Sequence, residues 1–181
     1  MKKQYLFFLL LSPALLFSQE ETASPSAIPG WVMEDWNFQT AGTATWIADN
    51  ATYKNENEPY DAYGMQWEWG LGKKSLKGRL YCIREGKDIG TVWQFLQFWD
   101  PGEKVVRMIQ IGADGTVGQG TQHLQEDGST KSSEQFNTPT GHRFESVHHS
   151  WKEEGIFHTQ SYDIVDGEWT KRRYYSWKLS K

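Results

Sequence analysis

Cysteine is almost absent from this chain: Cys82 is the one cysteine among 181 residues, so no internal disulfide can hold the fold. Basic residues are not in excess either. The 19 Lys and Arg against 23 Asp and Glu give a formal charge of −4, and no basic run occurs. A mildly acidic chain of this kind is a poor candidate for binding nucleic acid or an anionic membrane. Cys82 lies in an apolar segment, where we expect a small buried side chain rather than a nucleophile.

Strong catalytic and metal-binding motifs are also missing. The sequence has no pair of histidines at the spacing of a helical metal site, and no Ser–His–Asp triad can be assembled from a local motif. Gly115, Gly118 and Gly120 resemble a phosphate loop only superficially, because neither a helix nor a lysine follows them. We expect these glycines at turns and bulges. The sequence therefore indicates no cofactor and no metal.

The N-terminal apolar run is short. Lys2 and Lys3 precede the apolar stretch from Tyr5 to Leu11, and a plausible cleavage site lies before Gln19. This pattern predicts a secretory signal peptide over residues 1–18, with a retained interfacial anchor as the alternative. Cleavage would leave an exported protein, periplasmic or extracellular, with no membrane insertion. Loss of two lysines and no acids moves the formal charge from −4 to −6. We expect a linker or arm over 19–37 and one barrel domain over 38–181.

Regular turn signals divide the chain from about residue 60 onward. Each contains a glycine, which allows the backbone angles of tight hairpins. They are Gly86-Lys87, Pro101-Gly102, Asp114-Gly115, Asp127-Gly128, Glu154-Gly155 and Asp166-Gly167. Between them lie runs of about ten residues rich in β-branched and aromatic side chains. Strands joined in this way pair with their sequence neighbours, and a long meander tends to close because closure removes its edges. The pattern predicts an all-β, antiparallel up-and-down β-barrel of about ten strands.

The expected elements follow from these turns. A first strand spans Thr43–Ala48, and a polar loop over 50–61 covers one barrel mouth. The segment around Trp31 to Phe38 is expected to form a short helix or an entry strand that closes one barrel end. The remaining strands are expected near 62–71, 75–85, 90–99, 104–112, 116–126, 131–137, 143–152, 156–164 and 168–179.

The last strand alternates as a half-buried strand should, but it carries a cation on its apolar face, and the middle strands do not alternate. In the last strand, Arg173 shares a predicted face with Trp169, Tyr175, Trp177 and Leu179. The strands within 90–112 are apolar on both faces: Trp93, Phe95 and Trp99 oppose Val92, Leu96 and Phe98, and Val105, Ile109 and Ile111 oppose Val106 and Met108. Two apolar faces require a cover on the outside of the barrel. Either the segment 31–38 or a homodimer through strands 90–112 would supply it, and the dimer is slightly favoured.

The window YDAYGMQWEWGLGKKSLKGRLYCIREGKDIGTVWQFLQFWDP, with the terminal GEWTKRRYYSWK, carries a resemblance. It is similar to a family of uncharacterised bacterial proteins with a lipocalin-like, calycin-type β-barrel. The pieces WEWG, KGRLY, FWDP and DGxVGxG support this similarity. The resemblance implies ligand binding inside the barrel and assigns no reaction. It also implies a Trp near the barrel start beneath a basic residue of the last strand, positions that Trp46 and Arg173 would fill.

The aromatic content of 15%, with ten tryptophans, exceeds what a core usually needs and suits the walls of a ligand pocket. We expect Trp67, Trp69, Trp93 and Trp177 to stack against a small, partly apolar or amphipathic ligand. Arg173, Gln97 and Gln110 are polar residues in apolar strands and would hold its polar end. Arg173 has an alternative role as a structural latch, stacked on a Trp and bonded to strand-end carbonyls.

Titratable residues open further alternatives. Glu68 lies between two tryptophans and either points outward to pair across its hairpin or is buried with Arg79. His148 and His158 flank one turn and would share a face only if the hairpin register made residue sums even. Arg79, His148 and His158 are therefore also candidate ligand-binding residues.

Three functions remain open at this stage. The leading one is a ligand-binding barrel. The second is a small-molecule enzyme on the same barrel, an isomerase, cyclase or hydrolase, which needs a pair such as Glu68 with His148 or His158. The third is a structural or interaction module that associates through the strands of 90–112.

Overall fold

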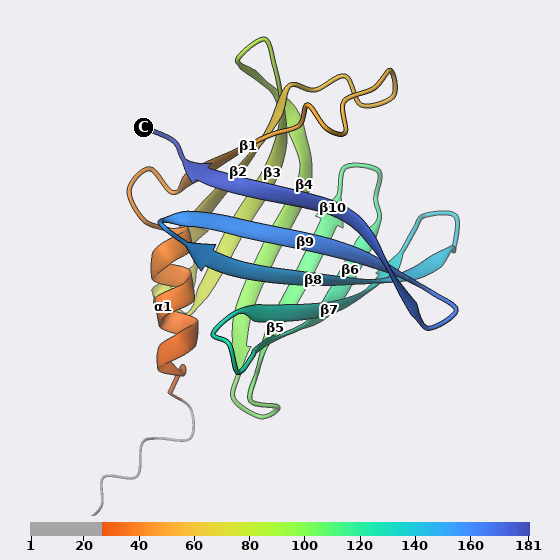
Figure 1. Cartoon of the computed structure of the whole chain (residues 1–181). Helices are drawn as coiled ribbons and strands as arrows, with labels where there is room; N and C mark the ends of the chain where they lie inside the picture. The colour runs from red at the N-terminus through yellow and green to blue at the C-terminus, as the bar shows by residue number, and fades with distance from the viewer. Residues whose placement is uncertain (1–26) are drawn as a thin grey trace, which may run out of the picture.

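The computed structural model describes residues 27–181 and shows a closed, all-antiparallel barrel of ten strands with a short helix near its N-terminal end (Figure 1). Helix α1 spans Gly30–Gln39, and a single 3₁₀ turn spans Leu71–Lys73. The strands are β1 Thr45–Asp49, β2 Ala62–Trp69, β3 Ser75–Arg84, β4 Lys87–Asp100, β5 Val105–Gly112, β6 Val117–Leu124, β7 Thr130–Asn137, β8 Arg143–Glu153, β9 Ile156–Val165 and β10 Glu168–Leu179. The predicted signal peptide lies outside the described residues.

Every strand pairs with its sequence neighbour, and β1 closes the barrel against β10. This seam is short: Trp46 pairs with Leu179 and Ile47 with Lys178, and Ser180 adds a hydrogen bond to the carbonyl of Thr45. The predicted ten-strand architecture is confirmed. β4 begins at Lys87, three residues before its predicted start.

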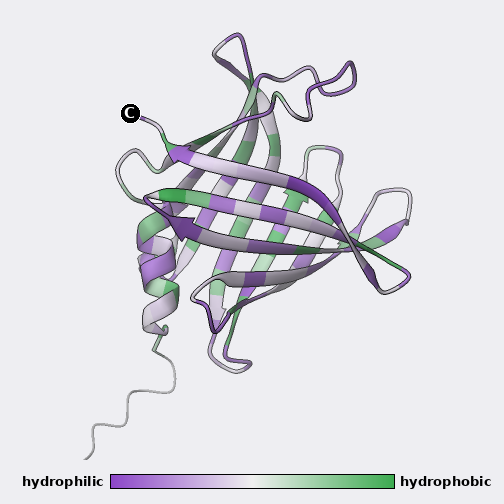
Figure 2. Cartoon of the chain, in the orientation of Figure 1, coloured by the Kyte–Doolittle hydropathy of each residue, from purple (hydrophilic) through white to green (hydrophobic). Residues whose placement is uncertain are grey.

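The turn chemistry explains the regular spacing. Gly86, Gly115, Gly128, Gly155 and Gly167 all have positive φ, as tight hairpin turns require. The turn after Pro101 differs, because there the positive φ belongs to Lys104 rather than to Gly102. Along the strands, hydrophobic and hydrophilic segments alternate, with the connecting loops mostly hydrophilic (Figure 2).

Helix α1 closes one end of the barrel, as one of the two sequence alternatives predicted (Figure 1). Val32, Asp35, Trp36 and Gln39 are buried and lie on one helix face. The Trp36 indole N–H donates to Oε1 of Gln97 at 3.1 Å, and the Trp46 indole donates to the Gln39 carbonyl at 2.8 Å. Because α1 lies at the barrel end, it does not cover the outer wall of β4 and β5. The prediction that residues 31–38 could cover the apolar outer face of these strands is therefore wrong.

The outer wall of β4 and β5 retains apolar side chains. Leu96 pairs with Ile109 and Phe98 with Arg107 on this face, and Ile111 is 48% exposed. The inner face carries Val106, which is fully buried, and Met108. Both faces of these strands are therefore apolar, as predicted, and association through the outer one stays a prediction.

Register shifts in β10 and in the β3–β4 pairing change which residues face inward. In β10 the register shifts between Lys171 and Arg173, so Trp169 and Arg173 lie on opposite faces. The prediction that they share a face was wrong, and Trp169 packs on the outside against Tyr162. A shift in the pairing of β3 with β4 likewise lets Val92 and Trp93 both line the interior. The prediction that every second residue faces inward failed at both places, because a bulge inserts one extra residue into the strand.

Candidate functional site

The barrel encloses a cavity of about 670 Å³ between helix α1 and the opposite mouth. One wall is aromatic and apolar and comes from β2, β3, β4, the start of β9 and β10. The residues there include Tyr63, Met65, Trp67, Leu80, Trp93, Phe95, Phe157 and Trp177. The other wall comes from β5 to β9 and is mostly polar, with Gln110, Gln122, Ser132, Glu134, Ser146, His148, Ser150, Thr159 and Ser161. The cavity thus presents an apolar side and a hydrogen-bonding side to one space.

The aromatic wall is ordered by close packing between rings and strand glycines. Trp67 stacks on Phe95 with ring centroids 5.4 Å apart, and its ring lies over Gly78, its partner on β3. A Cβ at Gly78 would lie 2.4 Å from this ring, so only glycine leaves room for it. The Trp177 indole donates to Oγ1 of Thr159 at 3.0 Å, which fixes its orientation. These contacts hold flat rings against the cavity before any ligand arrives.

Glu134 is the central polar residue of the opposite wall. It is only 4% exposed, and its carboxylate accepts hydrogen bonds from the Gln110 amide and from Oγ of Ser132 at 3.2 Å. Burial raises the pKa of Glu134 to about 7, although both hydrogen bonds act to lower it. A carboxyl group in this state exchanges its proton near neutral pH.

Gly120 makes this position of Glu134 possible. Gly120 pairs with Glu134 across β6 and β7, and a Cβ there would lie 2.1 Å from the Ser133 carbonyl oxygen and 2.6 Å from Cγ of Glu134. The absent side chain lets Gln110 of β5 reach Glu134 of β7 across β6. Gly118 gives the Phe136 ring the same space. The glycines of β6 therefore act within the strand; of the predicted group only Gly115 lies in a turn.

We predict that Gly120→Ala destabilises the protein by about 2 kcal/mol, because backbone as well as side-chain atoms must move to admit the methyl group. Urea unfolding followed by circular dichroism measures the change. Gly30→Ala is the matched control: nothing lies within 4 Å of a Cβ there, and we expect a change under about 0.5 kcal/mol. A Gly120→Ala variant as stable as the control would contradict the close packing of β6 on β7.

His148 lies diagonally from Glu134 on the same inner face. In the β7–β8 register Ser132 pairs with His148 and Glu134 with Ser146, which places the two titratable side chains roughly 7 Å apart at Cβ. His148 Nε2 lies 3.3 Å from Oγ of Ser146. Burial, with a smaller contribution from the neighbouring Arg172, lowers the pKa of His148 to about 4. His148 is therefore neutral at neutral pH.

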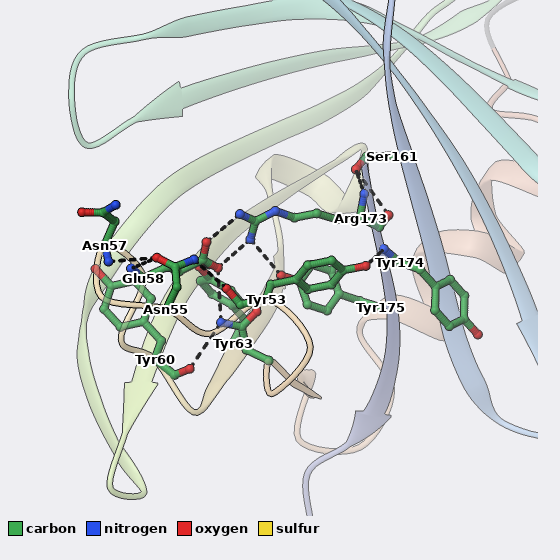
Figure 3. A network of polar contacts seen from close by, with 11 residues as sticks. Tyr53, Asn55, Asn57, Glu58, Tyr60, Tyr63, Ser161, Arg173, Tyr174 and Tyr175 are labelled. Carbon is green, nitrogen blue, oxygen red and sulfur yellow. Dashed lines mark hydrogen bonds and ion pairs between the residues drawn. The ribbon is translucent and has the colours of Figure 1, made fainter. Parts of the chain in front are cut away.

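Arg173 is held at the mouth of the cavity by the loop over 50–61 (Figure 3). Its guanidinium forms two hydrogen bonds with the Glu58 carboxylate, at 2.5 and 2.6 Å, and lies 5.2 Å from the Tyr53 ring. Tyr63 also donates to Glu58, at 2.6 Å. The guanidinium holds the pKa of Glu58 below its usual range, and the hydrogen bonds to the Glu58 carboxylate raise the pKa of Arg173. We call this ion pair the Glu58–Arg173 latch.

Arg173 forms a structural latch, as one alternative predicted, but its partners are not the Trp ring and strand-end carbonyls that were expected. The partner is a carboxylate of the mouth loop, and the stacked ring is Tyr53 rather than a Trp. Trp46 lies at the opposite end, packed on Phe38 of helix α1 with ring centroids 4.8 Å apart. The implied placement of Trp46 beneath Arg173 is not observed.

We predict that Glu58→Gln lowers the free energy of unfolding by about 2 kcal/mol, because it leaves a half-buried guanidinium without a counter-charge. Amide hydrogen exchange over residues 50–61 is expected to speed up by more than tenfold. Glu68→Gln provides the control, since Glu68 pairs with Lys77 in the open at 2.9 Å and such pairs contribute little. Unchanged exchange in the Glu58 variant would show that the latch does not hold the loop.

Seven of the ten sequence-predicted ligand residues line the cavity: Trp67, Trp93, Gln97, Gln110, His148, Arg173 and Trp177. The other three do not. Trp69 packs edge-on against Trp36 of helix α1, with centroids 6.1 Å apart. Arg79 lies outside, where it pairs with Asp88 at 2.9 Å and covers the Tyr81 ring.

His158 also faces outward, because the register pairs His148 with Ser161 and the residue sum is odd. It packs against Trp151 and Tyr174, whose rings also contact each other, and its Nδ1 lies 2.7 Å from the Tyr174 hydroxyl. Glu68 is on the outer wall with Lys77. The acid–base pairs predicted for an enzyme, Glu68 with either histidine, are therefore not formed.

Glu134, Gln122 and Glu58 are site residues that sequence reasoning missed. β7 alternates buried and less buried residues through Thr130, Ser132, Glu134 and Phe136. This period-two signal was hidden because most of its inward residues are polar. Cys82 is 2% exposed within the hydrophobic core, as predicted.

Comparison with protein-family models, with curated proteins and with solved structures finds no match for this chain. Within residues 27–181 no helix is long and apolar enough to cross a membrane. The same part of the chain contains no group of three or more His, Cys, Asp or Glu side chains arranged to hold a metal ion. The function must therefore be argued from the cavity itself.

Proposed function

We propose that this protein is an exported, lipocalin-like barrel that binds a small amphipathic molecule in its interior. The observation that carries the proposal is the cavity of about 670 Å³ with one aromatic wall and one hydrogen-bonding wall. Cavities of this size and character are typical of sites for small organic ligands. The ligand's apolar body would lie against Trp67 and Phe95, and its polar end would face Glu134.

Entry is proposed through the mouth beneath the loop over 50–61. Helix α1 fills the other end, where Trp36 is fully buried and hydrogen-bonded to Gln97. Glu58 and Arg173 both line the cavity at the mouth, so opening of the latch would admit a ligand. Loops that admit ligands are often held by a few contacts of this kind.

Titration with N-phenyl-1-naphthylamine tests the proposal, because this neutral aromatic probe fluoresces strongly only in apolar surroundings. We expect saturable binding with one site per chain. Met108 lines the cavity from β5, and Met108→Trp puts a larger side chain into it, so we expect binding to weaken at least tenfold. Ile109→Trp, the next residue and on the outer face, is the matched control and should bind as the wild type does. Equal binding by both variants would place the probe outside the barrel and overturn the proposal.

A second candidate is acid–base chemistry in the same cavity. The observation that favours it is Glu134, with a pKa raised to about 7, diagonal to a neutral His148. Incubation with a small-molecule extract of the source organism, followed by mass spectrometry, tests it. A compound converted by the wild type and left unchanged by Glu134→Gln would favour catalysis over binding alone.

A further inference from the structure

The cationic side chains that line the cavity already have anionic partners. Arg173 is engaged through both of its terminal nitrogens by Glu58, and Arg172 pairs with Asp163 at 3.2 Å. No lysine within residues 27–181 lines the cavity, and His148 is neutral at neutral pH. Among the described residues, a ligand carboxylate would therefore find no free positive charge in the cavity and would have to displace Glu58.

The hydrogen-bond acceptors of the polar wall, in contrast, lack cationic partners among the described residues. Across residues 27–181, Glu134 forms no ion pair, and its partners Gln110 and Ser132 are uncharged donors. Gln122 lines the same wall and is 7% exposed; it donates to Thr130 at 2.9 Å, while its Oε1 accepts no hydrogen bond from any described residue. Gln122 pairs with Ser132, which places it diagonal to Glu134.

The surroundings of Glu134 also suit a cation. Phe136 is the next inward residue of β7, and Trp93 meets its ring edge-on with centroids 5.8 Å apart. Aromatic faces attract ammonium groups, most strongly where water is excluded. Along the inner face, Glu134 thus has on one side the Gln122 amide oxygen, which has no partner among the described residues, and on the other side the rings of Phe136 and Trp93.

We propose that the ligand's polar end is a protonated amine, held by the Glu134 carboxylate and the Gln122 amide oxygen. This proposal rests on ligand binding in the barrel and names its chemical class. The amine places a positive charge against the one buried cavity carboxylate that lacks a charged partner among the described residues, since Asp114, which also lines the cavity without an ion pair, is exposed. Its remaining N–H groups supply the donor that Gln122 needs. The aromatic wall around Trp67 would take the ligand's ring or chain.

Proton release should accompany such binding. The pKa of Glu134 is about 7, so close to half of the molecules carry a protonated carboxyl at pH 7. An ammonium ion stabilises the ionised form, and binding at pH 7 should therefore release about half a proton per ligand.

Isothermal titration calorimetry with three probes of one shape tests the class: 1-naphthylmethylamine, 1-naphthylmethanol and 1-naphthoate. We expect the amine to bind at least tenfold more tightly than the alcohol, and the carboxylate most weakly. Titration in buffers of different ionisation enthalpy measures the proton released. Glu134→Gln should remove both the preference for the amine and the proton release, whereas Glu68→Gln, on the outer wall, should retain both.

Several outcomes would overturn the inference. If the carboxylate or the alcohol binds as tightly as the amine, the inference of an amine ligand is overturned, while the proposal that the barrel binds a small molecule stands. An amine preference that survives in Glu134→Gln would assign the selectivity elsewhere. If none of the three probes binds, the amine class is rejected, and the binding proposal is judged by its own titration with N-phenyl-1-naphthylamine.

Discussion

Trp36→Ala is expected to lower the free energy of unfolding by about 4 kcal/mol, the largest loss we anticipate from one substitution. Trp36 is fully buried where helix α1 meets the barrel end, and it contacts Trp69 and donates to Gln97. Its removal leaves a large void and an unpaired Gln97 oxygen. Urea unfolding measured by circular dichroism gives the change directly.

Trp169→Ala is the matched control, because Trp169 is 48% exposed on the outer face. We expect it to cost less than about 1 kcal/mol. Trp36→Phe keeps most of the buried volume and should fold even if the alanine variant does not, at a cost of about 2 kcal/mol. A Trp36→Ala variant as stable as the Trp169 control would contradict the packing of α1 into the barrel end.

The second large effect is a pH dependence that two substitutions should separate. Glu134 has a pKa of about 7 in the folded protein, above its ordinary 4.5, so its contribution to stability is present below pH 4.5 and is lost as the pH rises to 7. His148 has a pKa of about 4, below its ordinary 6.5, so its contribution is present above pH 6.5 and is lost as the pH falls to 4. Between pH 4.5 and 6.5 the two slopes oppose each other.

Ligand-free wild-type protein should therefore change little in stability between pH 5 and 6.5. In Glu134→Gln only the pH dependence from His148 remains, so the free energy of unfolding should rise by about 1.4 kcal/mol per pH unit. His148→Gln should fall by a similar amount per unit, because only the Glu134 slope remains. The carboxylates with lowered pKa, such as Glu58 and Asp61, act mainly below this window.

Urea midpoints at four pH values for the wild type, the two variants and the double variant measure these slopes. The double variant should again be nearly flat. Parallel curves for all four proteins would contradict the burial of both groups in one cavity wall.

Local chemistry explains why so much of the fold was predictable. Asp or Glu followed by Gly sets the positive φ of a tight turn within two residues, and the strand between two turns has little freedom left. A short helix or an entry strand around Trp31 to Phe38 was anticipated at one barrel end, and the structure has the helix there, from Gly30 to Gln39. Its position on the barrel end rather than on the outer wall depends on Gln97 and Lys152, which are distant in sequence.

The site was less predictable because its determinants are non-local. The bulge at Arg172 reverses the faces of β10, and nothing in the local pattern marks it. Glu58 lies in a polar loop, 115 residues from Arg173, so the latch could not be inferred from spacing. Glu134 has room on the inner face because Gly120 lies opposite, a relation that needs the register of two strands.

Native mass spectrometry of the protein purified from its source organism tests the central proposal most directly. We expect a bound species of a few hundred daltons at one copy per chain, lost on denaturation and absent from Met108→Trp prepared in the same way. Ile109→Trp should retain it. Wild-type protein that carries no small molecule under these conditions, and gains none on incubation with an extract of its own cells, would contradict a ligand-binding barrel.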